Sequence, residues 1–248
     1  MLIFILSIAA QVGFIVHVIK TGRNTLWIWV LVIPVLAFPG MLAYFFVEIL
    51  PDIFRSRTAQ RTARGFKKAM DPEGDLRRYE HEARVGGNVA SRQRYADELT
   101  RHGRYDEAIA QYRSALTGLY EHDPNLMLGI AKAQFAKGGA GDATAARATL
   151  DDLIRLNPDF RSPDGHLLYA RALESEGNIQ KALEEYQALA TSYPGAEAAV
   201  RYAQLLQTQG RREDAQKVAS ELLEQARIAP AHYRKAQKSW LDAAQRLL

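Results

Sequence analysis

The stretch GNIQKAL at residues 177–183 decides the fold, because it places a glycine five residues before an alanine. The same arrangement recurs along the chain, with spacings of 38, 36 and 33 residues between successive glycines. The four pairs are Gly103 with Ala108, Gly141 with Ala146, Gly177 with Ala182, and Gly210 with Ala215. Recurrence at this period predicts a helical repeat protein. An ordinary helical bundle with chance spacings is the alternative.

Further positions agree between the copies. Small residues precede the turn glycine by seven positions: Ala96, Ala131, Ala170 and Ala203. For Ala131 the count runs from Gly138, because three extra residues are expected in the turn of the second copy. Large apolar residues follow the glycine by nine positions in three copies, with an alanine in the fourth: Tyr112, Leu150, Tyr186 and Ala219. Prolines close the first three copies: Pro124, displaced by an insertion at 117–123, Pro158 and Pro194. This pattern resembles that of tetratricopeptide repeats, and the resemblance implies an all-α solenoid of about four helix pairs.

Elementary packing explains the pattern. Two antiparallel helices approach closely only where small side chains face each other, so alanine is expected at both crossing positions. A turn glycine supplies the left-handed residue that ends the first helix, and a proline ends the second because it cannot continue it. Segments 105–109 and 179–183 are therefore predicted to begin second helices.

Two helices are expected to flank the repeats. Asp71-Pro72-Glu73 offers a capping carboxylate and a proline at the first helical position, which predicts a helix over 72–85 that ends at Gly86-Gly87-Asn88. After Pro230, apolar residues follow at helical spacing: Tyr233, Ala236, Trp240, Ala244 and Leu247. This spacing predicts a C-terminal capping helix over 232–248, which would cover the apolar face of the last repeat. The repeat domain is thus predicted over 71–248.

The first 50 residues differ from the rest in composition. Of 32 Lys and Arg and 28 Asp and Glu residues, only Lys20, Arg23 and Glu48 lie there. Residues 2–19 and 26–47 carry no formal charge, and each run is close to the roughly 20 residues that span a bilayer as a helix. We expect a transmembrane helical hairpin over 1–50. A signal peptide would need a basic segment before the apolar run, and buried soluble helices would need a large core on every side.

A basic linker over 51–70 follows the hairpin. It holds six cations and, after residue 52, no carboxylate: Arg55, Arg57, Arg61, Arg64, Lys67 and Lys68. Two cations lie in the hairpin turn, so the excess predicts that the linker and the repeats face the cytoplasm. We expect an integral protein of a bacterial inner membrane whose linker contacts anionic lipid. Nucleic acid is the weaker reading of this charge, because no aromatic platform or recognition fold accompanies it.

The hairpin also resembles a known membrane domain. Residues 11–48 have tryptophans after a short turn, then Pro39-Gly40, Tyr44 and an acidic residue at the exit. They are similar to the N-terminal two-helix domain of phospholipase-D-type cardiolipin synthases. That family's chemistry uses a His-x-Lys motif, and no histidine of this chain has lysine two positions later. The resemblance therefore implies an anchor without phosphatidyl transferase activity.

The sequence offers little for catalysis. The chain has no cysteine, which excludes disulfides, thiolate nucleophiles and cysteine-ligated metals. Its six histidines form neither an HExxH motif nor an i, i+4 pair on an acidic helix face, and no Walker lysine follows the glycines at 138–141. We expect a non-enzymatic protein without cofactor or metal.

The resemblance to tetratricopeptide repeats implies that the first helix of each pair lines a concave groove. The family's groove positions that carry polar side chains here are Gln93, Asp97, Lys132, Arg171 and Gln204. Lys132 and Arg171 occupy the same position in adjacent repeats and could together bind an acidic stretch. The sequence thus predicts a membrane-anchored cytoplasmic scaffold or adaptor with a protein or peptide partner in the groove. The alternative is an accessory factor for phospholipid or envelope synthesis.

Overall fold

The structure is a computed structural model that describes residues 12, 16, 19, 20, 47 and 71–248. Within 71–248 the chain forms helices and no strand. In order they are α6 (Gly74–Gly86), α7 (Val89–Arg101), α8 (Tyr105–Ala115), the 3-10 helix η2 (Gly118–Tyr120), α9 (Pro124–Lys137), α10 (Ala140–Leu156), α11 (Pro163–Ser175), α12 (Ile179–Ser192), α13 (Glu197–Thr208), α14 (Arg212–Ile228), α15 (Ala231–Ala236) and α16 (Lys238–Gln245). The predicted all-α repeat fold is confirmed.

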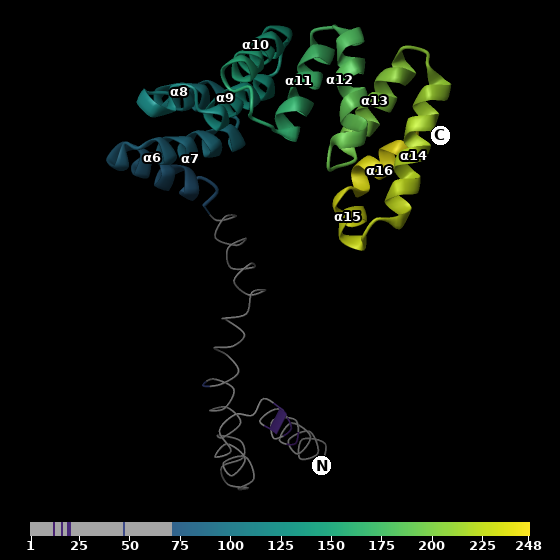
Figure 1. The fold of residues 1–248 in the computed structure, drawn as a ribbon. Coiled ribbons are helices and arrows are strands. Elements are labelled where there is room, and N and C mark those ends of the chain that lie inside the picture. Colours follow the sequence, from purple (N-terminus) through teal and green to yellow (C-terminus); the bar gives the residue numbers. More distant parts are fainter. Residues whose placement is uncertain (1–11, 13–15, 17–18, 21–46, 48–70) are drawn as a thin grey trace. The chain divides into compact units, whose positions relative to one another are not determined.

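The helices pack as four consecutive pairs, α7 with α8, α9 with α10, α11 with α12 and α13 with α14 (Figure 1). We call α7, α9, α11 and α13 the first helices and their partners the second helices. First helices of neighbouring pairs also approach one another, α7 with α9 and α9 with α11. Because inner elements of a curved stack lie closest together, the first helices line its concave side.

The predicted crossing positions are confirmed. The eight alanines are at most 1% exposed: Ala96, Ala108, Ala131, Ala146, Ala170, Ala182, Ala203 and Ala215. The large residues that follow are buried beside them, with Tyr186 fully covered and Leu150 2% exposed. Burial of these residues is the main contribution that holds the two helices of each pair together.

The turn glycines are confirmed in three copies and corrected in the second. Gly103, Gly177 and Gly210 have φ between +73° and +78°, as a left-handed turn after the first helix requires. In the second copy this residue is Gly138 at φ +84°, whereas Gly141 lies inside α10. The three extra residues expected in the turn are therefore helical. They add nearly one turn to the start of α10, so Ala146 still reaches the crossing.

Two predicted helix boundaries were wrong. Pro124 begins α9 rather than closing the first copy, because Asp123 caps that helix by accepting from the backbone N–H groups of Asn125 and Leu126. The insertion before it contains η2. At the N-terminal flank, Asp71 forms a turn in which its carbonyl accepts from the Gly74 N–H at 3.2 Å. This turn delays the start of the flanking helix to Gly74.

The C-terminal cap is present but interrupted. Its residues form α15 and α16, which meet at Gln237. The Gln237 side-chain oxygen accepts from the Ala196 N–H at 3.1 Å, and so ties the break to the start of α13. Ala244 and Leu247 are buried against α13 and α14 as predicted, whereas Ala236 is exposed.

The predicted hairpin and basic linker fall, apart from residues 12, 16, 19, 20 and 47, outside the described residues. Among the described residues, no helix combines the length and apolar character that a bilayer crossing requires. Residues 75–248 form one compact unit.

Candidate functional site: the inner groove of the repeats

A cavity of about 480 Å³ opens on the first helices and forms the candidate site. We call it the inner groove. Its walls come from α9, from α11 and from the segment that joins α12 to α13: Lys132, Phe135, Ala136, Asp164, Leu167, Leu168, Arg171, Tyr193 and Glu197. The sequence-predicted Lys132 and Arg171 thus lie in one cavity.

Lys132 marks one end of the groove. Its ammonium group lies 3.9 Å from the carboxylate of Asp164, and both side chains are about half exposed or more. Asp164 sits in the first turn of α11, where the helix dipole favours a negative charge. The Tyr193 hydroxyl donates to Asp164 at 3.3 Å, and burial together with this carboxylate raises the pKa of Tyr193.

Arg171 lies deeper in the groove. Its guanidinium group stacks over the Phe135 ring at 4.8 Å and lies 3.9 Å from the Glu197 carboxylate. Glu197 makes a closer ion pair with Arg201 at 2.8 Å, and Arg201 in turn lies over the Trp240 ring at 5.3 Å. Because one carboxylate serves two guanidinium groups, Arg171 is only partly neutralised.

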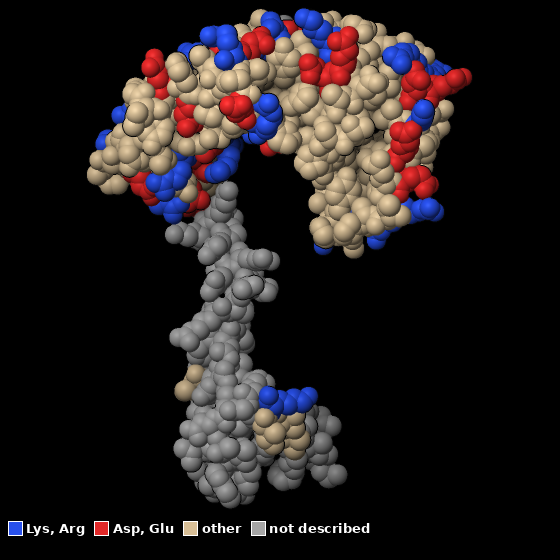
Figure 2. Space-filling view, in the orientation of Figure 1, with Lys and Arg blue, Asp and Glu red and all other residues tan. Residues whose placement is uncertain are grey.

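Two cations, Lys132 and Arg171, therefore line the groove with two carboxylates, Asp164 and Glu197, and Glu197 is shared with Arg201 beyond the lining. Figure 2 shows blue and red side chains interspersed over the face of the repeats that it presents, with no large field of one sign. Any charge selectivity of the groove would consequently arise from its own side chains and fall with salt.

The other sequence-predicted groove residues lie outside this cavity. Asp97 accepts a hydrogen bond from the Tyr112 hydroxyl, which joins α7 to α8 within one repeat. Burial and this bond raise the pKa of Tyr112. Gln93 is half-buried on α7, and Gln204 is exposed on α13.

Sequence reasoning missed Phe135, Asp164, Tyr193 and Glu197. Phe135 follows Lys132 by three positions, so helical spacing could have placed it beside that lysine. Tyr193 ends α12 and Glu197 begins α13, so neither lies on the first helices that carry Lys132 and Arg171 at equivalent positions. Asp164 lies in the first turn of α11, which Ser162 caps by accepting from the Gly165 N–H at 3.0 Å. Within 71–248, no three His, Asp or Glu side chains are grouped in a way that could hold a metal ion.

Comparison with known proteins agrees with this geometry. The family profile of the tetratricopeptide repeat matches residues 95–158 and again 136–197. Comparison with curated proteins gives no significant match. Residues 95–197 are thus similar to tetratricopeptide repeats.

Solved structures share the fold. A crystal structure of MamA has a TM-score of 0.52 and 21% identity, and the match covers 64% of this chain and 91% of MamA. A thermophilic TPR protein from Thermus thermophilus, TTC0263, also has a TM-score of 0.52, with 20% identity over 74% of this chain and 94% of that one. At such identities the likeness concerns the fold alone.

Proposed function

We propose that this protein is a non-enzymatic scaffold or adaptor whose inner groove binds an acidic segment of a protein partner. The observation that carries the proposal is that Lys132 and Arg171, from equivalent positions of adjacent repeats, line one cavity and make only long ion pairs with the carboxylates there. Tetratricopeptide repeats provide a rigid concave surface on which such a segment can lie.

The ion pairs within the groove are weak enough for a carboxylate of a ligand to replace the carboxylates of the protein. Lys132 and Arg171 each lie 3.9 Å from their carboxylates, at the long end of ion pairing, and pairs this exposed contribute about 0 to 1 kcal/mol. A partner carboxylate could replace them at little cost. Phe135 holds the Arg171 guanidinium by stacking, which preserves its orientation for a bidentate contact.

The proposal includes a membrane anchor at the N-terminus. It rests on the two uncharged runs at 2–19 and 26–47 and on the cations of the 51–70 linker. Val12, Val16 and Ile19 repeat at helical spacing and are 43 to 63% exposed, an arrangement that suits contact with lipid. No observation on residues 71–248 favours the alternative role in phospholipid or envelope synthesis.

Affinity capture from membranes tests the groove. The full-length chain and the double variant Lys132→Glu with Arg171→Glu would be compared by quantitative mass spectrometry of the proteins that co-purify. We expect the variant to lose the principal partner while it keeps its helical content. The matched control is Lys181→Glu with Lys217→Glu, which changes two exposed cations on second helices and should retain the partner. Equal capture by both double variants would contradict the proposal.

Reporter fusions test the anchor. A reporter that folds only in the cytoplasm should be active when it is fused after Leu248. The same reporter inserted at Gly22 should be inactive, because that position is predicted to lie outside the cytoplasm. Digestion of the repeats by protease added to intact spheroplasts would contradict this topology.

A further inference from the structure

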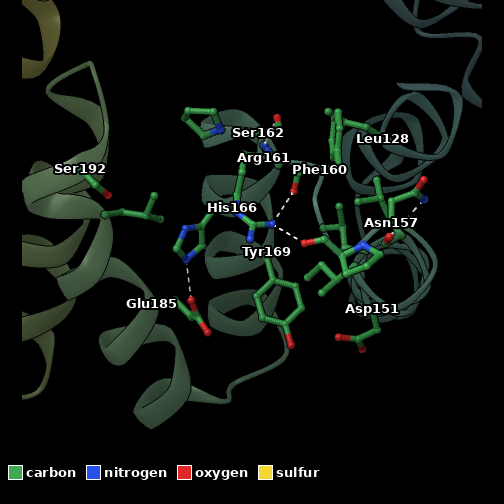
Figure 3. Close-up of a pocket in the computed structure, with 17 residues that line it drawn as sticks. Leu128, Asp151, Asn157, Phe160, Arg161, Ser162, His166, Tyr169, Glu185 and Ser192 are labelled. Carbon is green, nitrogen blue, oxygen red and sulfur yellow. Dashed lines mark hydrogen bonds and ion pairs between the residues drawn. The ribbon is translucent and has the colours of Figure 1, made fainter. Parts of the chain in front are cut away.

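A second cavity, of about 620 Å³, lies between α10, α11 and α12 (Figure 3). We call it the outer cavity. From α11 it receives Pro163, Gly165, His166 and Tyr169, whereas the inner groove receives Asp164, Leu167, Leu168 and Arg171. At 100° per residue these two sets occupy opposite faces of α11. The outer cavity is thus a separate surface from the groove.

The floor of the outer cavity is apolar. Leu150, Leu153 and Leu189 are buried there at 1 to 4% exposure, and Phe160 adds a ring from the loop before α11. Leu150 and Leu153 belong to one hydrophobic cluster and Leu189 to another, so the cavity opens where the core of the second repeat gives way to that of the third. Ile154 lies on the lining and is 56% exposed. The volume of the cavity is in the range of pockets that enclose a ligand group.

The rim carries an excess of carboxylate. Glu185 lies 2.6 Å from the His166 ring, which is charged only when protonated. Figure 3 shows the two side chains pointing toward each other. Asp151 pairs with Arg147 at 2.6 Å, but the same guanidinium group also pairs with Glu176 at 2.7 Å.

The remaining cation on the rim is already engaged. The Arg161 guanidinium donates to the carbonyl groups of Pro158 and Phe160, 2.5 Å and 3.2 Å away, and thereby closes its own loop. Two carboxylates, Asp151 and Glu185, consequently line the cavity with one permanent cation, Arg161, whereas the inner groove has equal numbers of each.

We propose that the outer cavity is a second binding site, which takes a segment of a partner protein with an apolar side chain next to a lysine or arginine. The apolar side chain would occupy the floor between Leu153 and Leu189, and the cation would reach Glu185 and Asp151. This proposal does not depend on the inner groove, because the two sites use different faces of α11.

The test uses two tetrapeptides that differ only in charge, acetyl-Ala-Phe-Arg-Ala-amide and acetyl-Ala-Phe-Glu-Ala-amide. Each is titrated into the full-length chain in detergent micelles while the methyl NMR signals of Ile154, Leu153 and Leu189 are followed. We expect the arginine peptide to shift these signals and to bind at least about fivefold more tightly than the glutamate peptide. Absence of shifts at these methyls, or equal affinity for both peptides, would overturn the proposal.

Two matched variants test whether the Glu185 carboxylate is the group that attracts the arginine peptide. Glu185→Gln should weaken the arginine peptide about two- to fivefold, since a half-exposed pair contributes modestly. Glu184→Gln removes the same charge one residue earlier, where the side chain is exposed and contacts Gln180, and should leave the affinity unchanged. Equal effects of the two changes would assign the preference to the general field of the protein and overturn the site.

A further pair of variants tests the apolar part. Ile154→Lys places a cation on the cavity lining and should abolish measurable binding of the arginine peptide. Leu119→Lys makes the same change at a fully exposed leucine in η2 and should have no effect. If Ile154→Lys fails to fold, the Glu185 and Glu184 pair still decides the question. Retained binding by folded Ile154→Lys would contradict the placement.

Discussion

The crossing of α11 with α12 and the inner groove differ in how many repeats build them. Ala170 and Ala182 meet within a single repeat, and both are fully buried. The groove joins Lys132, Arg171 and Glu197, which come from three successive repeats. A sterically required residue recurs with the period of the chain, whereas a surface assembled across repeats has no such requirement. The comparison therefore separates what stabilises the solenoid from what gives it a specific surface.

The largest effect is expected at the crossing. Ala182→Leu would overpack the contact between α11 and α12 and lower the free energy of unfolding by about 1 to 3 kcal/mol. Ala188→Leu adds the same side chain at an exposed position of α12 and should change it by less than about 0.5 kcal/mol. Thermal unfolding measured by circular dichroism compares the two, and equal melting temperatures would mean that the helix register is wrong.

The next effect lies one turn further along α12. The Tyr186 hydroxyl donates to the Glu174 carboxylate at 2.6 Å, so Tyr186→Phe should cost about 1 to 2 kcal/mol at neutral pH. Chemical denaturation measures this loss. An unchanged midpoint would show that the hydrogen bond adds no net stability.

The same bond predicts a dependence on alkaline pH. Burial, followed by the hydrogen bond to Glu174, raises the pKa of Tyr186 above its unfolded value of about 10. The resulting stability is fully present below pH 10 and is lost as the pH rises through the folded-state pKa. Wild-type stability should therefore fall more steeply above pH 10 than that of Tyr186→Phe. Parallel profiles would contradict this assignment.

Glycine substitutions in the second repeat should have effects of opposite sign. Gly138 has φ +84°, so Gly138→Ala should destabilise by about 1 kcal/mol. Gly141 lies in α10 with open space around its Cα, and Gly141→Ala should stabilise by about 0.5 to 1 kcal/mol. Melting temperatures of the two variants check the corrected register, and a destabilising Gly141→Ala would restore Gly141 as the turn residue.

The smallest effect on stability is expected in the groove. The double variant Lys132→Glu with Arg171→Glu should change the free energy of unfolding only modestly, by about 0.5 kcal/mol, because both side chains are at least a third exposed. Denaturant titration checks this value. A loss as large as that of Ala182→Leu would show that these cations hold the fold together, and would remove them as tests of binding.

The sequence predicts the parts of the fold that sterics impose. Alanines, turn glycines and the large apolar residues recur because each repeat must satisfy the same packing, and they identify all four pairs. The sequence could not show that the extra residues extend α10. Three residues are nearly one helical turn, so Ala146 faces the same way whether they lie in the turn or in the helix. The sequence also could not foresee that Gln237 interrupts the cap to bind Ala196, a contact between residues 41 positions apart.

The candidate site was predictable in part. Helical position brought Lys132 and Arg171 together, since equivalent residues of stacked repeats face the same way. Their carboxylate partners, Asp164 and Glu197, lie at the starts of other helices. The repeat pattern does not require a charged residue at those positions. The outer cavity could not be predicted from the sequence. It depends on the spacing between α10 and α12 on either side of α11, which no sequence pattern specifies.

Site-specific photocrosslinking tests the central claim most directly, that partners bind the inner groove. A benzoylphenylalanine at Ala136, an exposed residue in the groove wall, would be compared in native membranes with the same label at Ala188, exposed on α12. We expect the label at Ala136 to crosslink one principal protein, and Lys132→Glu with Arg171→Glu to abolish that product. A crosslink formed only from Ala188, or one from Ala136 that survives the double change, would contradict the account.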